Sequence, residues 1–154
     1  MVNDLYQEII LDHSKKPRNC HTMDDASSKA EGYNPLCGDK LKLFIKIEGD
    51  IVKDASFVGS GCAISTASAS LMTETLKGKT REEALKLLER FHDLLTTDTV
   101  VTAELGKLVV FCGVRDYPAR VKCATLAWHT LKSALTADGE PVTTEWATRC
   151  TIGW

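Results

Sequence analysis

The sequence predicts an α+β domain in which a small antiparallel β-sheet packs against several α-helices. Two extended segments, 40–48 and 51–58, are joined by a tight turn, and helical patterns lie before and after them. The order helix, hairpin, helices is typical of the α+β class. The 154 residues contain no internal repeat or linker, so we expect one domain spanning 1–154.

The predicted hairpin rests on alternating polarity and on a glycine turn. Apolar residues from Leu41 to Ile47 alternate with mostly charged ones, which is largely the pattern of a strand with one buried face. Gly49-Asp50 then turns the chain into the second extended segment, 51–58. Because the turn is tight, antiparallel pairing is the expected arrangement.

Four helices are predicted around the hairpin from periodicity, caps and breakers. They cover 4–13 with Asn3 as N-cap, the segment from Ala63 to a C-terminal Gly78, the segment from an N-cap at Thr80 to about Leu94, and the segment from Pro118 to about Leu135. Residues 18–35 are polar and aperiodic, and we expect a long surface loop there. Segment 95–118 fits extended chain, short helix or strand, and the choice stays open.

Composition excludes several classes of function. The formal net charge is -2 and the pI is about 6.1, which gives no basic surplus for nucleic acid or an anionic membrane. No apolar stretch approaches the length of a membrane span, and the N-terminus lacks the features of a secretory signal. We therefore expect a cytoplasmic protein. In a reducing compartment its six cysteines favour metal binding or thiol chemistry over disulfides.

The first candidate ligands lie at the start of the first predicted strand. Residues two apart in a strand point to the same face, so Cys37 and Asp39 can aim at one point, with Gly38 leaving room for a ligand. Cys62 follows Gly-Ser-Gly at the start of a helix, where free N–H groups and the helix dipole stabilise a thiolate. Both cysteines are candidates for a reactive or metal-bound thiol.

Cys123 is the third candidate thiol, near the beginning of the last helix. Arg120, three residues earlier, adds positive charge that favours thiolates. Three thiolates and one carboxylate suit tetrahedral zinc with a total charge near -2, which Arg120, Lys40 and Lys122 can offset. The cysteines form no C-x-x-C knuckle, so spacing leaves a metal site and unrelated buried cysteines about equally supported.

Three sequence blocks resemble the cysteine blocks of the SufU family, which is related to the IscU scaffolds. They are NPLCGD at 34–39, GSGCAIS at 59–65 and PARVKCATLAW at 118–128, and the opening LYQEIILDHSKKPRN at 5–19 also matches that family. The resemblance runs from about Leu5 to Leu135. Two features favour SufU over IscU: an insertion between the second and third blocks, and Lys122 where the IscU scaffolds carry a histidine.

The resemblance implies an IscU/SufU-like fold with about three strands and a zinc-dependent sulfurtransferase activity. It implies Cys37, Asp39, Cys62 and Cys123 as zinc ligands, with Cys37 as sulfur acceptor and Arg120 beside the site. The implied partners are a SufS-type cysteine desulfurase, which would lend a histidine to the zinc and release Cys37, and downstream Suf scaffold proteins. Nucleic acid and membrane are not among them.

Two alternatives remain open beside the sulfurtransferase. The same thiolates could hold iron or a transient [2Fe-2S] cluster, with the protein acting as an assembly scaffold. The metal could instead only stabilise a non-catalytic interaction domain. The other thiols, Cys20, Cys112 and Cys150, are interpreted as incidental, and the four histidines as core or solvated side chains, because none adjoins a cysteine block.

Overall fold

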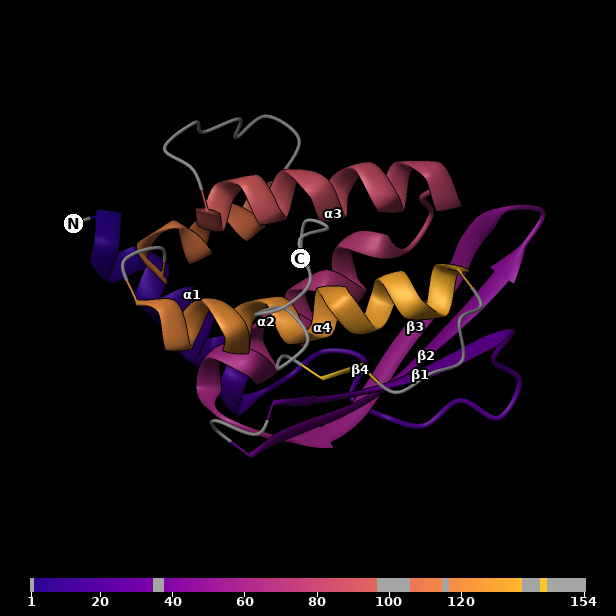
Figure 1. Ribbon diagram of the computed structural model, residues 1–154, viewed down its shortest axis with the longest axis horizontal. Helices are drawn as coiled ribbons and strands as arrows, with labels where there is room; N and C mark the ends of the chain where they lie inside the picture. Colours follow the sequence, from indigo (N-terminus) through magenta and orange to yellow (C-terminus); the bar gives the residue numbers. More distant parts are fainter. Residues whose placement is uncertain (1, 35–37, 97–105, 115–116, 137–141, 144–154) are drawn as a thin grey trace.

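The computed structural model describes residues 2–34, 38–96, 106–114, 117–136 and 142–143. Its elements, in chain order, are α1 (Val2–Lys15), β1 (Ser28–Asn34), β2 (Asp39–Glu48), β3 (Ile51–Ser60), α2 (Ala63–Leu76), α3 (Arg81–Thr96), the 3-10 helix η1 (Gly106–Val114), α4 (Pro118–Thr136) and β4 (Val142–Thr143) (Figure 1). The predicted α+β class is confirmed. None of the described helices has the length and apolar character needed to cross a membrane.

The sheet has the strand order β3-β2-β1-β4. Strands β1, β2 and β3 form an antiparallel meander, and the two-residue β4 pairs with β1 in parallel. The predicted hairpin is confirmed: Gly49 and Asp50 both have positive φ, 56° and 69°, as a tight turn between antiparallel strands requires. The register shift opposite Lys46 and Ile47 leaves Lys53 without a partner in β2, which marks a bulge in β3.

The prediction of a surface loop over 18–35 is wrong for its second half, which forms β1. The strand does alternate, with Ala30, Gly32 and Asn34 buried between exposed neighbours. Its inward side chains are small or polar, so the alternation carries no hydrophobic signal. Gly32 is required there, because a Cβ at this position would collide with Thr130 of α4.

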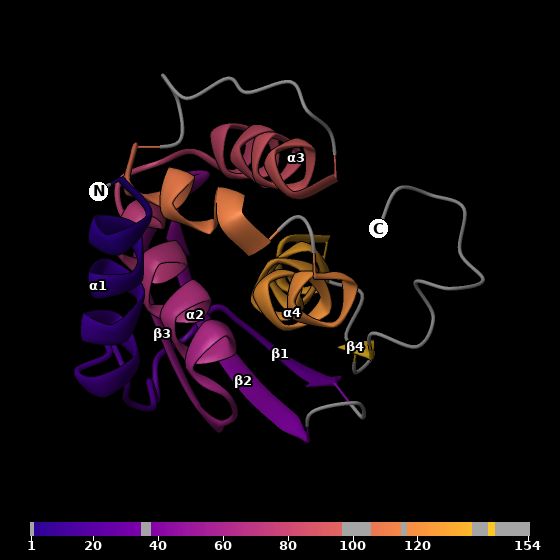
Figure 2. The same ribbon diagram turned by 90° about the vertical axis from the view of Figure 1, so that its left-hand side faces the viewer.

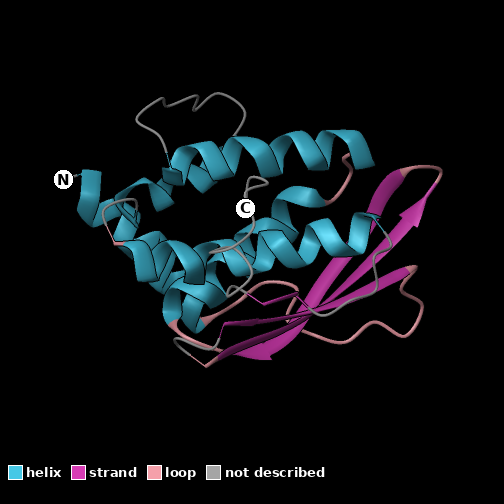
Figure 3. Ribbon diagram, in the orientation of Figure 1, coloured by secondary structure: helices cyan, strands magenta, loops and turns pink. Residues whose placement is uncertain are grey.

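The helices lie on one face of the sheet, as Figures 2 and 3 show. Helices α2 and α4 pack directly against the strands, and α1 packs on α2. Three aromatic rings join the outer helices to this layer: Phe91 of α3 stacks on Trp128 of α4 at 4.6 Å and meets Phe111 of η1 edge-on at 5.6 Å. All three rings are fully buried. The apolar core therefore fixes α4 against both α3 and the sheet.

The boundaries of α2 and α3 follow the predicted caps, whereas the predicted N-cap Asn3 lies inside α1, which begins at Val2. Thr80 and Glu83 form a reciprocal capping box before α3, with both backbone-to-side-chain distances at 3.1 Å. Gly78 has a φ of +87° just beyond the end of α2, which is the backbone conformation that glycine tolerates best. Within the segment left open, 106–114 is the 3-10 helix η1; residues 97–105 and 115–116 lie outside the described residues.

A buried polar contact joins α1 to α2. The Nδ1 atom of His13 lies 2.7 Å from the Ser70 hydroxyl, which also accepts the backbone N–H of Arg18 at 2.9 Å. Burial is the main cause that lowers the pKa of His13, so the ring is neutral at pH 7. Ser70 therefore satisfies two polar groups where α1 ends.

Replacing Ser70→Ala should lower the free energy of unfolding by about 1–3 kcal/mol, because it leaves both groups buried without this partner. Urea titration at pH 7.5 measures the loss. Ser14→Ala is the matched control, since the Ser14 hydroxyl bonds only to Leu11 in its own helix at an exposed position. Equal stability losses in the two variants would contradict the role given to Ser70.

Candidate metal centre

Three potential metal ligands converge where the sheet meets two helices. Asp39 is the first residue of β2, Cys62 immediately precedes α2, and Cys123 lies in the second turn of α4. One donor atom from each lies within 4.8 Å of the other two. Asp39 and Cys123 are fully buried, whereas Cys62 is half-buried and gives the cluster its exposed side. Among the described residues, this is the one such group of histidine, cysteine and acidic side chains.

The Asp39 carboxylate is the centre of this arrangement. Its Oδ1 accepts the backbone N–H of Cys62 at 2.8 Å, and its Oδ2 lies 3.9 Å from Cys62 Sγ. The side-chain amide of Asn34 donates to the same Oδ2 at 3.3 Å. A Cβ on Gly61 would come within 2.6 Å of Oδ1, so the glycine before Cys62 lets the chain approach the carboxylate.

Cys62 caps the N-terminus of α2 with its sulfur. Its Sγ accepts the backbone N–H of Ser65 at 3.4 Å, in the position where serine or aspartate usually serves as N-cap. Hydrogen bonding with Cys123 is the largest cause that lowers the pKa of Cys62 to about 6, and the Ser65 N–H lowers it further, against the opposing effects of burial and of Asp39. The predicted thiolate at this helix start is thus supported by the geometry.

Cys123 reaches the cluster from the inner side of α4. Its sulfur accepts a hydrogen bond from the Asn34 amide at 3.5 Å. Sequence spacing alone did not show that Cys123 lies beside Asp39 and Cys62. The packing of α4 on the sheet brings it there, because the helix contacts both β1 and β2.

The donor set fits a tetrahedral zinc ion. Donors about 2.0–2.3 Å from such an ion are about 3.3–3.8 Å apart, and the 3.9 Å between Cys62 Sγ and Asp39 Oδ2 is close to that range. Two sulfurs and a carboxylate oxygen leave one position for a further ligand. The same sulfur-rich set is compatible with iron.

The other predicted site residues have different outcomes. Cys37 lies outside the described residues. Arg120, in the first turn of α4, is exposed, and within the described part of the chain its side chain makes no hydrogen bond or ion pair. Lys40 is exposed and Lys122 is half-buried. Asn34 was not predicted as a site residue. Had β1 been recognised as a strand, its register with β2 would have placed Asn34 opposite Asp39.

The remaining thiols and histidines lie apart from the cluster in the described structure. Cys20 is exposed beside β3, and Cys112 is half-buried in η1; Cys150 lies outside the described residues. His129 is buried on α4, and burial is the main cause that lowers its pKa to about 3, so it is neutral at pH 7.

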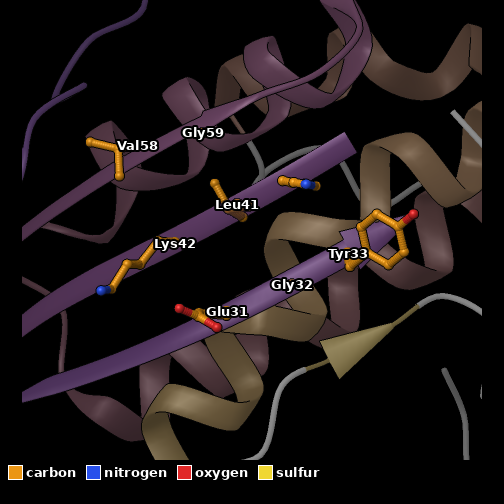
Figure 4. Close-up of a pocket in the computed structure, with 8 residues that line it drawn as sticks. Glu31, Gly32, Tyr33, Leu41, Lys42, Val58 and Gly59 are labelled. Atoms are coloured by element: carbon orange, nitrogen blue, oxygen red, sulfur yellow. The ribbon is translucent and has the colours of Figure 1, made fainter. Parts of the chain in front are cut away.

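A separate hollow lies on the sheet face that the helices leave uncovered (Figure 4). It has a volume of about 360 Å³, and its lining includes the exposed side chains of Glu31, Tyr33, Lys40 and Lys42. Successive residues of β2 point to opposite faces, so Lys40 faces away from the buried Asp39 beside it. The sheet itself therefore separates this hollow from the metal cluster.

The fold and the cluster agree with the comparisons to known proteins. Residues 5–136 match the family described as the NifU-like N terminal domain. The chain belongs to this family, which includes the IscU and SufU proteins of iron–sulfur cluster assembly.

Individual relatives cover most of the chain. It is 42% identical over 138 residues to the zinc-dependent sulfurtransferase SufU of Bacillus subtilis, covering 89% of this chain and 93% of the relative. It is 41% identical over 135 residues to the iron-sulfur cluster assembly scaffold protein IscU of Streptococcus pyogenes, covering 87% and 84%. The crystal structure of FiSufU from Fervidobacterium islandicum AW-1 superposes with a TM-score of 0.81 at 38% identity, covering 86% of this chain and 98% of that one.

The lowered pKa of Cys62 predicts that, in the metal-free protein, this cysteine is alkylated at a lower pH than an ordinary thiol. The thiolate is the reactive form and is present above the pKa, so the rate of Cys62 modification by iodoacetamide should rise through a midpoint near pH 6. Peptide mapping by mass spectrometry measures the profile. In Cys123→Ala the largest cause of the shift is removed, and the midpoint should move to higher pH. A wild-type midpoint near 8.5 would contradict the assignment.

Proposed function

We propose that this protein is a zinc-dependent sulfurtransferase that accepts persulfide sulfur from a SufS-type cysteine desulfurase and delivers it to downstream Suf scaffold proteins in the cytoplasm. The observation that carries the proposal is the buried cluster of Asp39, Cys62 and Cys123, in a chain that shares 42% identity with a zinc-dependent sulfurtransferase. Membership of an iron–sulfur cluster assembly family supports the proposal that the sulfur is used to build clusters.

Cys37 completes the proposed ligand set and acts as the sulfur acceptor. It precedes Asp39 by two positions, a separation that covalent geometry limits to about 7 Å between Cα atoms. Between them Gly38 has a φ of +71°, a turn conformation that most other residues avoid. Bound zinc would keep the four ligands ionised at neutral pH while damping the reactivity of their thiolates.

The transfer step is a thiolate attack on a persulfide. The Cys37 thiolate attacks the outer sulfur of the persulfide on the desulfurase cysteine, forming a new S–S bond. The old S–S bond breaks, and its electron pair leaves with the desulfurase cysteine as a thiolate. One sulfur atom has then moved to Cys37 as a persulfide, without net oxidation or reduction.

The two described cysteines of the cluster are less suited to that attack. Cys123 is fully buried and its sulfur accepts a hydrogen bond, so a persulfide on another protein has no access to it. Cys62 has a lowered pKa, but its sulfur serves as the N-cap of α2 through the Ser65 N–H, a structural role that the proposed acceptor does not carry. Arg120 and Lys122 offer positive charge to offset a ligand set that carries about -2 with zinc included, whereas Lys40, expected to help, faces the opposite side of the sheet. Arg120 is exposed and precedes Cys123 by three residues, and we assign its positive charge to attracting the incoming persulfide.

A [2Fe-2S] scaffold is the second candidate function, favoured by the IscU relatives at 41% identity. Three cysteines and an aspartate can hold a cluster as well as zinc. Lys122 stands where the IscU scaffolds are expected to carry a histidine, which removes one familiar ligand. Iron, sulfide and visible absorption in anaerobically purified protein would support the scaffold, and zinc without sulfide the sulfurtransferase.

Adding the wild-type protein to a SufS-type desulfurase should raise cysteine turnover several-fold, and Cys37→Ala should abolish the increase because no acceptor thiol remains. Sulfide release with cysteine as substrate measures turnover, and mass spectrometry should detect 32 Da added at Cys37.

Cys20→Ala is the matched control, since Cys20 is exposed and lies outside the cluster. It should stimulate the desulfurase as the wild type does. Stimulation by Cys37→Ala equal to that of the wild type would disprove the relay. Zinc removal that unfolds the protein, with no stimulation by the zinc-loaded form, would instead favour a zinc-stabilised interaction domain.

A further inference from the structure

Asn34 is a fully buried amide in contact with two of the three clustered ligands. Its Nδ2 atom lies 3.3 Å from Asp39 Oδ2 and 3.5 Å from Cys123 Sγ. A single NH₂ group has two hydrogens, so it can donate to both atoms at once. Nothing in the backbone requires a polar side chain here, since the preceding inward positions of β1 are Ala30 and Gly32.

The strand register determines which ligand Asn34 meets. Asn34 and Asp39 are directly opposed at the end of the β1–β2 ladder, and side chains of such pairs lie on the same face of the sheet. Helix α4 packs across β1 and brings Cys123 to the same amide. The contact thus links a strand ligand to a helix ligand that are 84 positions apart in sequence.

The chemistry of the two acceptors explains why an amide is suitable. A carboxylate and a thiolate held within 4.8 Å repel one another, and both are removed from water. Two N–H donors compensate both acceptors without adding a charge. Lysine would also donate, but its full charge would compete with a metal cation, whereas an amide presents only a dipole.

We infer that Asn34 is a positioning residue that holds Asp39 and Cys123 as the fixed half of the metal centre, leaving ligand exchange to the more exposed side of the cluster. An N–H···S hydrogen bond draws electron density from the sulfur, so it also sets the donor strength of Cys123. The inference rests on the metal centre in the proposed function, but it concerns metal binding and not sulfur transfer.

Cobalt(II) substitution tests the inference, because sulfur-to-cobalt charge-transfer bands report the electron density on the thiolates. Asn34→Leu keeps a similar volume without donors, and Asn34→Ala provides a smaller variant if leucine does not fit. Both should shift the charge-transfer band to lower energy and weaken cobalt and zinc binding by about 10–100-fold in chelator competition.

Thr130→Val is the matched control. Thr130 is fully buried at the same contact between α4 and β1, and among the described residues its hydroxyl bonds only to the Leu126 carbonyl of its own helix, at 2.8 Å. It should leave band position and affinity unchanged. Circular dichroism establishes that each variant is folded before the metal titration.

An unchanged band in both Asn34 variants, with or without weaker binding, would overturn the inference, because a merely structural role does not alter the sulfur. A shift of equal size in Thr130→Val would overturn it as well, and so would a wild type that binds no cobalt. If the Asn34 variants behave as expected while the wild type fails to stimulate a desulfurase, the positioning role stands and the sulfurtransferase proposal fails.

Discussion

A buried carboxylate is the constraint on which the site depends. Asp39 is fully enclosed, and an unpaired charge in that position would cost several kcal/mol, so its oxygens must find donors. One donor is the backbone of Cys62 and the other is the Asn34 side chain. Satisfying Asp39 therefore brings the end of β3, the start of α2 and the end of β1 to one point. This close approach requires glycine at position 61, because a Cβ there would collide with the Asp39 carboxylate.

The cap at α2 connects the same constraint to the helical layer. A helix start leaves N–H groups without partners inside the helix, and the usual solution is an oxygen from serine, threonine or aspartate. Here the sulfur of Cys62 takes that position. One side chain thus serves both as a helix cap and as a candidate ligand, so the geometry of the cluster and the first turn of α2 are not independent.

Much of the architecture could be predicted from the sequence because it depends on local patterns. The hairpin, the capping box at Thr80 and the helix from Pro118 all have signals within a few residues. Strand β1 could not be recognised, since Ala30, Gly32 and Asn34 face inward without hydrophobic contrast. With β1 missing, Asn34 had no predictable neighbour. Cys123 likewise needed tertiary packing, or a family resemblance, to join Asp39 and Cys62.

Strand β2 is a boundary whose two sides have different chemistry. Asp39 and Leu41 face the helices, while Lys40 and Lys42 face the uncovered side of the sheet. A strand shifted by one residue exchanges its faces, so a one-residue slip of β2 against its neighbours would turn the carboxylate of Asp39 outwards and point Lys40 towards the helices. The register of β2 is therefore as important to the cluster as the identity of Asp39, because the carboxylate meets Cys62 and Cys123 only in the alignment that also buries Leu41 and Leu43.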